Sequence, residues 1–231
     1  MPAPTVVNVG TVASGAASIT PAFPASIATN DILIGVGETS LGQTYPTIAT
    51  NGFAHIDSVS PVVQSTNTSL HVVWRRYDGV VTAHAWGDSG DHNLGRYIAI
   101  RGCPTSGNPW DVVAVATEAT SDTSASWPTA TTTVADTLVL LCLATSADIA
   151  TAQISSVTNA NLTSITERMD NAITTGDGGV IICYTGVKAS AGAIGASTAT
   201  LTTAGFKAFM TLAMKEAPAV TGPPILVMPP L

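Results

Sequence analysis

The stretch Phe-Lys-Ala-Phe-Met-Thr-Leu-Ala-Met-Lys, residues 206–215, decides the fold class. Its apolar side chains recur at every second position from Phe206 to Met214, and Lys207 and Thr211 fall between them. Successive side chains of a β-strand point to opposite faces of the sheet. The alternation therefore predicts a half-buried strand with one apolar face and one mostly solvent-exposed face.

Shorter runs elsewhere in the chain predict further strands. Residues 32–36 form an apolar run that is entered through a turn-forming cluster at residues 29–31. Residues 70–77 alternate Leu, Val and Trp with His, Val, Arg and Tyr, and residues 96–101 form another extended run. These runs match the length and the β-branched or aromatic content of short strands.

Turn signals are frequent and helix signals are weak. The dipeptide Asp78-Gly79 favours a tight turn between strands, so we expect a hairpin there. Ser164 and Glu167 have the spacing of a helix capping box. Gly176 follows too soon for a helix of more than about two turns, and we favour strand and turn in this stretch.

The composition extends this pattern to the whole chain. Charged residues make up 10% of the 231 residues, against about 25% in an average globular protein. Thr and Val fit a pleated sheet, and the helix formers Glu, Lys and Arg are scarce. We therefore predict an all-β protein, a jelly-roll-like antiparallel β-sandwich with a hydroxyl and alanine surface and extended terminal arms.

Two segments resemble copies of one unit. Aligning the apolar run after Asp31 with the run after Asp136 gives a shift of 105 residues, the difference between 136 and 31. One interpretation is an internally duplicated strand set with halves 13–117 and 118–217, and the other is chance matching among Ala, Thr and Val. Both interpretations place residues 13–217 in one sandwich, because no linker of low hydrophobicity divides the chain at its middle.

Charge and hydropathy argue against two classes of partner. The net charge is −7 and the pI is near 4.7, whereas phosphate recognition needs clustered Lys and Arg, so we expect no nucleic acid. The longest apolar run, residues 138–144, has seven residues. A membrane helix needs about twenty, so we expect no membrane span and no membrane partner. We also expect the chain to stay in the cytoplasm where it is made, because its first residues lack the features of a signal peptide.

The cysteines predict neither disulfides nor a metal site. Cys103, Cys142 and Cys183 are odd in number, and two of them lie within strongly apolar runs. We interpret them as small core residues. A structural zinc site would need paired spacing such as C-x-x-C, and we predict no metal and no cofactor.

One motif imitates an enzyme. Residues 87–90 read Gly-Asp-Ser-Gly, the nucleophile signature of trypsin-like proteases, and His84 lies just upstream. In that family the histidine and the serine come from distant parts of the chain. His84 and Ser89 are too close in sequence for this geometry, and we predict that the chain is not an enzyme.

Two loops carry weaker signals for bound ions. Asp88, Asp91 and Asn93 place three oxygen-bearing side chains in one loop, which allows a calcium ion, although calcium takes six or more oxygens and a plain turn is the simpler interpretation. Residues 176–179 read Gly-Asp-Gly-Gly but lack the Lys-Ser/Thr of a phosphate-binding loop.

Aromatic residues give a second functional hypothesis. Exposed Trp and Tyr side chains stack on the apolar faces of sugars, and the candidates for such a platform are Trp86, Trp110, Trp127 and Tyr45. The opposing interpretation places these residues in the core, since aromatic residues are only 5% of the chain.

The two ends of the chain are the predicted partner-binding elements. Residues 1–12 form an N-terminal arm or first strand, and residues 218–231 are rich in proline, which cannot donate to a central strand. These arms would add to a neighbour's sheet edge or dock in a groove, or else the second arm folds back over its own sandwich. The predicted contact residues are Val6, Val7, Val9, Val12, Ile225, Leu226, Val227, Met228 and Leu231.

Several short motifs between residues 10 and 215 resemble those of virion structural proteins of tailed bacteriophages and prophages. They are Ser18-Ile19-x-Pro21, Asp31-Ile32-Leu33-Ile34, Val73-Trp74-Arg75-Arg76-Tyr77, Gly90-Asp91-His92, Ile100-Arg101-Gly102, Asn108-Pro109-Trp110-Asp111 and Ala119-Thr120-Ser121-Asp122-Thr123. The motifs are structural, and the resemblance implies no catalytic residue. The proline-rich residues 218–231 depart from the pattern.

The resemblance implies a sandwich used in a virion, most simply as a capsid decoration or cement protein that binds the outer shell and stabilises the head. The implied partner is the major capsid protein or another virion protein, and the implied assembly is a homo-oligomer, with a trimer favoured. The alternative is a carbohydrate-binding receptor module of a tail fibre or head spike. We expect the protein to be located in the virion after assembly in the host cytoplasm.

Overall fold

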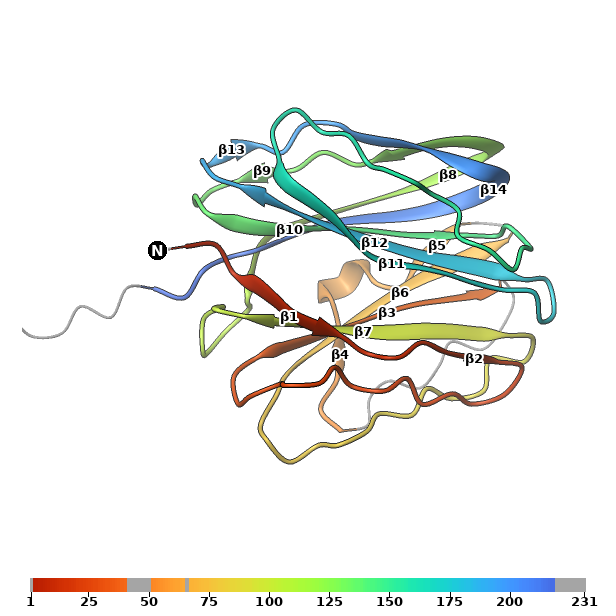
Figure 1. The fold of residues 1–231 in the computed structure, drawn as a ribbon, viewed down its shortest axis with the longest axis horizontal. Coiled ribbons are helices and arrows are strands. Elements are labelled where there is room, and N and C mark those ends of the chain that lie inside the picture. Colours follow the sequence, from red (N-terminus) through yellow and green to blue (C-terminus); the bar gives the residue numbers. More distant parts are fainter. Residues whose placement is uncertain (1, 41–50, 65–66, 219–231) are drawn as a thin grey trace, which may run out of the picture.

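The computed structural model describes residues 2–40, 51–64 and 67–218, and their regular structure is almost entirely β-strand (Figure 1). The predicted all-β class is confirmed. The elements are β1 (Thr5–Val9), β2 (Ala13–Gly15), β3 (Ile32–Ser40), β4 (Ala54–His55), the 3-10 helix η1 (Asp57–Val59), β5 (Val62–Gln64), β6 (Thr68–Arg76), β7 (Asn93–Arg101), β8 (Trp110–Trp127), β9 (Thr131–Thr132), β10 (Thr137–Thr145), β11 (Thr163–Ile173), β12 (Gly179–Lys188), β13 (Gly192–Ala193) and β14 (Ser197–Met214).

Two antiparallel sheets pack face to face (Figure 1). The first has the order β1-β7-β3-β6-β4, with β2 beside β7 and β5 beside β6, and the second has the order β11-β12-β10-β14-β8. Each sheet is formed by one half of the chain, which passes from the first sheet to the second between β7 and β8. The sandwich is as predicted, but its connectivity differs from a jelly roll, in which the chain crosses repeatedly between the sheets.

The two sheets have the same connectivity. The path β1-β7-β3-β6-β4 corresponds strand for strand to β8-β14-β10-β12-β11, with β3 and β10 at the two centres. Asn30 and Asp136, at φ 75° and 51°, stand just before these central strands. Each donates its backbone N–H to the carbonyl of the residue that follows the neighbouring strand, Tyr77 in the first half and Ala189 in the second.

These equivalent positions correct the sequence alignment by one residue. Asn30 matches Asp136, a shift of 106 residues (136 minus 30), whereas the alignment of Asp31 with Asp136 uses 105. A shift of one residue moves every side chain of a strand to the opposite face. With 106, Ile32 corresponds to Leu138, and both face the other sheet.

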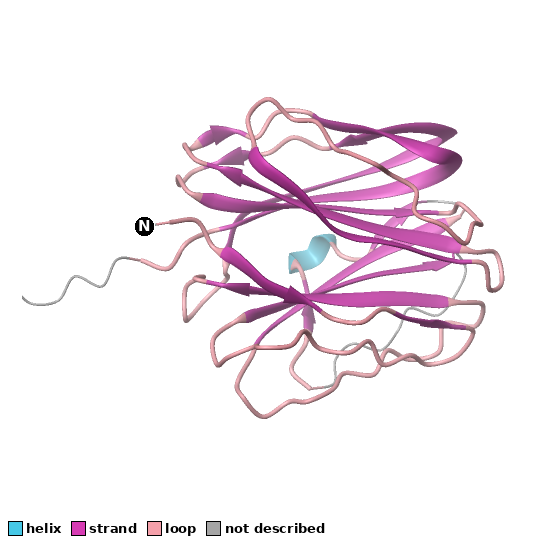
Figure 2. Cartoon of the chain, in the orientation of Figure 1, coloured by secondary structure: helices cyan, strands magenta, loops and turns pink. Residues whose placement is uncertain are grey.

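The central strands of both sheets, β3 and β10, are buried on both faces. The inter-sheet core, the apolar cluster between the sheets, includes Ile34, Leu140 and Met210. A second cluster around Trp86 covers the outer face of the first sheet, and a third around Trp127 covers the outer face of the second. Figure 2 shows that loops run along the outside of the sheets.

The covering loops explain one wrong prediction. Residues 206–214 do form a strand, the second half of β14, but its second face is not exposed to solvent. Phe209 packs in the outer cluster, and both Lys207 and Thr211 are fully buried. The Thr211 hydroxyl donates to the carbonyl of Pro128 at 2.7 Å, in the loop that covers this face.

The other local predictions are mostly confirmed. The runs at residues 32–36, 70–77 and 96–101 lie in β3, β6 and β7, and the Ser164–Glu167 stretch lies in strand β11. Asp78 does begin a turn, because its carboxylate accepts the N–H groups of two following residues. The predicted hairpin is wrong, since β3 lies between β6 and β7 in the sheet.

Candidate functional site

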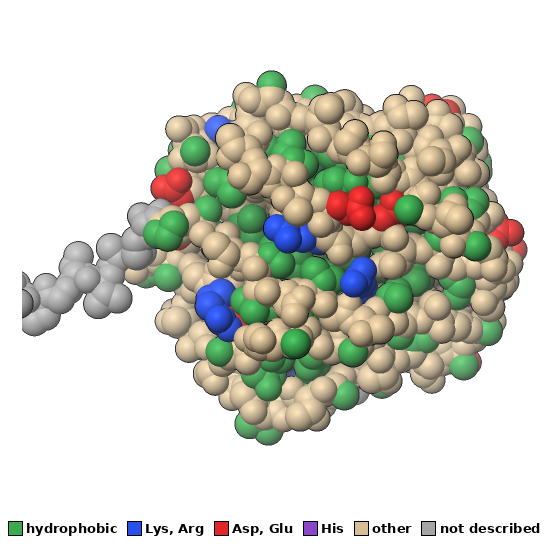
Figure 3. All heavy atoms as spheres, viewed as in Figure 1, with side chains coloured by type: hydrophobic (Ala, Val, Ile, Leu, Met, Phe, Trp, Pro, Cys, Tyr) green, Lys and Arg blue, Asp and Glu red, His purple; other side chains and the backbone are tan. Residues whose placement is uncertain are grey.

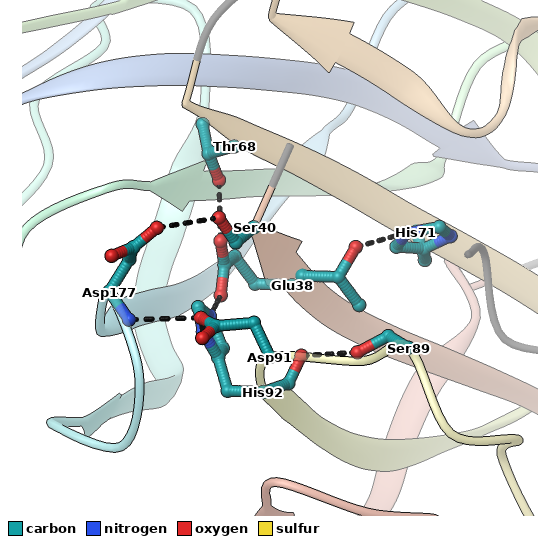
Figure 4. A network of polar contacts seen from close by, with 9 residues as sticks. Glu38, Ser40, Thr68, His71, Ser89, Asp91, His92 and Asp177 are labelled. Carbon is teal, nitrogen blue, oxygen red and sulfur yellow. Dashed lines mark hydrogen bonds and ion pairs between the residues drawn. The ribbon is translucent and has the colours of Figure 1, made fainter. Parts of the chain in front are cut away.

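A buried polar network joins the two sheets at one end of the sandwich (Figure 4). Its centre is Glu38, near the end of β3, whose side chain is fully buried. One carboxylate oxygen accepts a hydrogen bond from the Thr68 hydroxyl at 2.8 Å, and the other lies 2.7 Å from Nε2 of His92. Both oxygens of this buried acid are thus satisfied by groups of the first sheet.

His92 is held between two carboxylates. Its Nε2 faces Glu38, and its Nδ1 lies 2.8 Å from an oxygen of Asp91. The same Asp91 oxygen accepts the backbone N–H of Asp177 at 2.9 Å, from the turn that joins β11 to β12 in the second sheet. The Ser40 hydroxyl adds a longer bond of 3.4 Å to the Asp177 side chain. The network therefore ties one sheet to the other.

The glycine-rich run at residues 176–179 provides the room for this network. A Cβ at Gly179 would lie 2.0 Å from a carboxylate oxygen of Glu38, and one at Gly176, where φ is 61°, would lie 2.2 Å from the Asp91 carboxylate. A side chain at either position would displace the acids. The run that resembles a phosphate-binding loop in sequence is instead a close-packed turn against two carboxylates.

The electrostatics of the network favour a protonated His92. Burial by itself lowers the pKa of this imidazole, but the hydrogen bond and charge of Glu38, and then those of Asp91, outweigh it and raise the pKa to about 9. Burial raises the pKa of Glu38, while His92 and Thr68 act against that change. The N–H of Asp177 lowers the pKa of Asp91. The two neighbouring carboxyl groups thus favour the protonated form of the imidazole.

The protein shields the centre of this network from solvent. The side chains of Glu38 and His92 have no exposed area, and that of Asp91 is 24% exposed. A buried ion pair with its hydrogen bonds satisfied fixes the relative position of the elements that carry it. The chemistry that this site supports is a structural link between sheets.

The protease-like motif contributes to the same end of the molecule, but its serine and histidine make other bonds. The Ser89 hydroxyl is buried and donates to the carbonyl of His92 at 2.6 Å. His84 stacks on Phe53 with ring centroids 4.1 Å apart and bonds to the Tyr97 hydroxyl. The two motif residues serve separate parts of the first sheet.

The three oxygen-bearing side chains of the predicted calcium loop do not converge. Asp88 accepts the N–H of Gly90 within its own turn. Asp91 bonds to His92, and the Asn93 amide donates to the carbonyls of Ala17 and Gly87. Within the part of the chain that the structure describes, no group of three His, Cys, Asp or Glu residues is arranged to hold a metal ion.

The predicted sugar platform is not on the surface. Trp86, Trp110 and Trp127 are at most 6% exposed, and each indole N–H is bonded inside the protein. These three residues are core residues, as the opposing interpretation has it: Trp86 and Trp127 lie in the two outer clusters, and Trp110 lies in the inter-sheet core. Tyr45 lies outside the described residues.

The predicted N-terminal arm is an edge strand of this chain's own sandwich. β1 pairs with β7, Val6, Val9 and Val12 pack against the inter-sheet core, and Val7 packs against the outer cluster of the first sheet. Partner binding by this edge stays a prediction. The five predicted contact residues of the C-terminal arm lie outside the described residues.

The cysteines are placed as expected. All three are free and buried, and Cys142 and Cys183 lie on the neighbouring strands β10 and β12 with their sulfurs 3.8 Å apart.

Among the described residues no helix has the length and hydropathy needed to cross a bilayer.

The functional residue that the sequence analysis missed is Glu38. Its signal lies in the register of β3, since Ile32, Ile34 and Val36 face the inter-sheet core and the acid continues the same face. A carboxylate on a buried face requires a cation or donors nearby.

Comparisons of the chain with protein-family models, with curated proteins and with solved structures gave no match.

Proposed function

We propose that this chain is a structural protein of a tailed-phage particle, a decoration or cement protein that binds the outer face of the capsid and braces neighbouring subunits. The observation that carries the proposal is that several of the chain's few charged side chains form hydrogen bonds between the two sheets. The Glu38–His92–Asp91 network links the first sheet to the β11–β12 turn, and Arg96 of β7 donates to Asn171 of β11 at 3.0 Å.

These bonds resist sliding of one sheet over the other. Hydrophobic contact between two sheets is not directional, whereas a hydrogen bond fixes the relative position of its donor and acceptor. Two polar links, one at the Asp91–Asp177 contact and one at the Arg96–Asn171 contact, therefore hold the sheets in one register. A rigid slab of this kind suits a protein that transmits force between subunits.

The surface also supports a bracing role. On the face seen in Figure 3, neutral polar groups and small apolar patches cover most of the area, and charged side chains are few. Such a surface meets neighbours without a large desolvation cost for ionised groups. Repetition around a shell then multiplies a modest contact through effective concentration. The sequence motifs that resemble phage virion proteins support the same role.

The direct test is the location of the protein. Particles produced by the phage or prophage that encodes the chain would be purified, analysed by mass spectrometry and imaged with an antibody against the chain. We expect many copies per particle on the outer surface of the head. Absence from purified particles would contradict the proposal, and a location at the tail tip would replace bracing with adhesion.

The role of the C-terminal arm needs its own experiment. Purified heads that lack the protein would be incubated with the full chain or with a chain that ends at residue 217. If residues 218–231 dock on the major capsid protein, we expect lower occupancy for the shorter chain. Equal occupancy would remove the arm from the proposal but leave the location of the protein unchanged.

The carbohydrate-binding alternative has no structural support in the described residues. Its three described aromatic candidates are buried. A glycan array with the purified chain provides the test, and we expect no specific binding.

A further inference from the structure

The outer edge of β8 is the least protected strand edge of the sandwich. β8 is the last strand of the second sheet and pairs with β14 on one side, and none of the described strands pairs with its other side. In an antiparallel ladder, alternate residues direct their N–H and C=O groups away from the neighbour. β8 therefore presents a row of backbone groups that can pair with another strand.

The other edges carry features that limit such pairing. β1 has five residues and an irregularity between Val6 and Asn8, and β4 has two residues. β11 is longer, but its register breaks at two places. β8, by contrast, keeps continuous register with β14 from Val112 to Glu118. Short, bulged edges are the usual protection against edge-to-edge association, and this part of β8 lacks both devices.

The composition of this edge favours pairing as well. Residues 112–117 read Val-Val-Ala-Val-Ala-Thr, with no charge, proline or glycine. Val115 is 36% exposed, which makes it one of the few exposed large apolar residues of the described chain. Uncharged segments of high β-propensity pair readily with other strands when they lie at an edge.

We propose that β8 pairs with β8 of a second copy of this chain, antiparallel about a two-fold axis, so that the two second sheets form one continuous sheet. Each copy carries a net charge of −7, and like-charged molecules approach most easily through a segment that has no carboxylates. Residues 112–117 are such a segment. This inference does not rest on the proposed phage role.

Backbone geometry restricts the register of this pairing. Facing residues of an antiparallel pair both direct their N–H and C=O groups toward the partner strand or both direct them away, so the two-fold axis passes through a residue position and not between two residues. Ala114 is the position that places only Val and Ala nearest the axis. Val113 then faces Val115 of the other copy, and Asp111 faces Thr117.

The geometry also predicts the number of copies. An edge that pairs with itself about a two-fold axis is used up in the contact, so the assembly closes at two. This differs from the trimer implied by the resemblance. A trimer would need a second, complementary edge.

Analytical ultracentrifugation of the full chain over a wide concentration range tests the proposal. We expect the wild type to sediment as a dimer and the Val115→Lys variant as a monomer, because a lysine at an edge blocks strand addition. Val80→Lys is the matched control, since Val80 is 77% exposed in the loop between β6 and β7, and it should remain a dimer. A monomeric or trimeric wild type, or a dimeric Val115→Lys variant, would overturn the proposal.

A second variant keeps the test decisive if Val115→Lys does not fold. Opposed residues of an antiparallel pair have Cα atoms about 4.5–5.5 Å apart, which a disulfide can span. Ala114→Cys should therefore give a covalent dimer on mild oxidation, visible on a non-reducing gel, whereas Val80→Cys should not. The native cysteines are buried and should not contribute. Equal, slow cross-linking of both variants would exclude β8 pairing.

Discussion

Glu38 and Ala144 occupy equivalent positions in the two halves of the sandwich, near the ends of the central strands β3 and β10. Each lies on the face that points toward the other sheet, yet one is a carboxylate bound to His92 and the other is a methyl group in the apolar core. The same connectivity thus accepts an ionic network or hydrocarbon at one place. What decides is the surroundings, because Gly179 leaves room for the acid and His92 supplies the charge.

The largest effect should come from breaking the network on one side. In His92→Leu the buried Glu38 loses the cation that counteracts the effect of burial on its pKa, so it must either stay charged without a partner or take up a proton. The free energy of unfolding at pH 7 should fall by about 3–5 kcal/mol. Urea unfolding followed by circular dichroism measures the change. A loss of less than about 1 kcal/mol would mean that the pair contributes no more than a surface ion pair.

The control makes the first half similar to the second. The double variant Glu38→Ala/His92→Leu leaves no unpaired buried acid at this site, so it should be more stable than His92→Leu alone. A double variant that is less stable than the single one would contradict the view that the unpaired acid is the main cost.

The pH dependence should sharpen the same comparison. The pKa of His92 is about 9 in the folded protein and about 6.5 in the unfolded chain. A folded-state pKa that is raised gives stabilisation that is complete below pH 6.5 and is lost as the pH rises to 9. We expect the free energy of unfolding to fall by on the order of 2–3 kcal/mol between pH 6.5 and 9.5. In the double variant the decline over this range should be much smaller.

The space at Gly179 gives a prediction of intermediate size. Gly179→Ala places a Cβ 2.0 Å from Glu38, and overpacking of this kind costs about 1–3 kcal/mol. At Gly15 the nearest atom would be 3.9 Å away, so Gly15→Ala should change the stability by less than about 0.5 kcal/mol. Combining Gly179→Ala with Glu38→Ala should remove most of the cost, and an unchanged cost would show that the clash involves other atoms.

The smallest effect should come from the buried cation of the second half. Lys207 is fully buried, but its partners Glu118 and Asp122 have side chains 30% and 40% exposed. Lys207→Met keeps most of the apolar stem, and the two acids can be hydrated when the ammonium is gone. We expect a loss of about 1 kcal/mol or less, measured by the same unfolding experiment. A loss as large as that of His92→Leu would mean that partial exposure of the partner carboxylates does not reduce the cost of removing the cation.

Strand positions were predictable because each depends on a few neighbouring residues. The alternation at residues 206–215 and the apolar run at 32–36 indicated β14 and β3 correctly. The exposed face predicted for β14 was wrong because solvent exposure depends on distant loops. The Asp78-Gly79 turn was real, but the hairpin was not, since pairing is decided across the sheet and β3 lies between β6 and β7.

The candidate site was predictable only in part. Asp91 was a candidate of the calcium-like loop, and His92 stood in the Gly90-Asp91-His92 motif of the family resemblance, while Glu38 belonged to no motif. The contact between Glu38 and His92 joins residues 54 positions apart in the chain, and no spacing rule links them. The alignment of the two halves was also wrong by one residue, because similar letters do not reveal which face a side chain takes.

By itself the sequence determined the all-β class, the placement of the main strands and the apolar character of the cysteines, since alternation and composition act through local backbone geometry and burial. Only the tertiary structure decided that the central strands are covered on both faces, that Glu38 meets His92 beside Gly179, and that none of the other described strands pairs with the outer edge of β8. These features arise where segments distant in the chain meet, and the free energy of such contacts depends on their geometry in space and not on their order in the sequence.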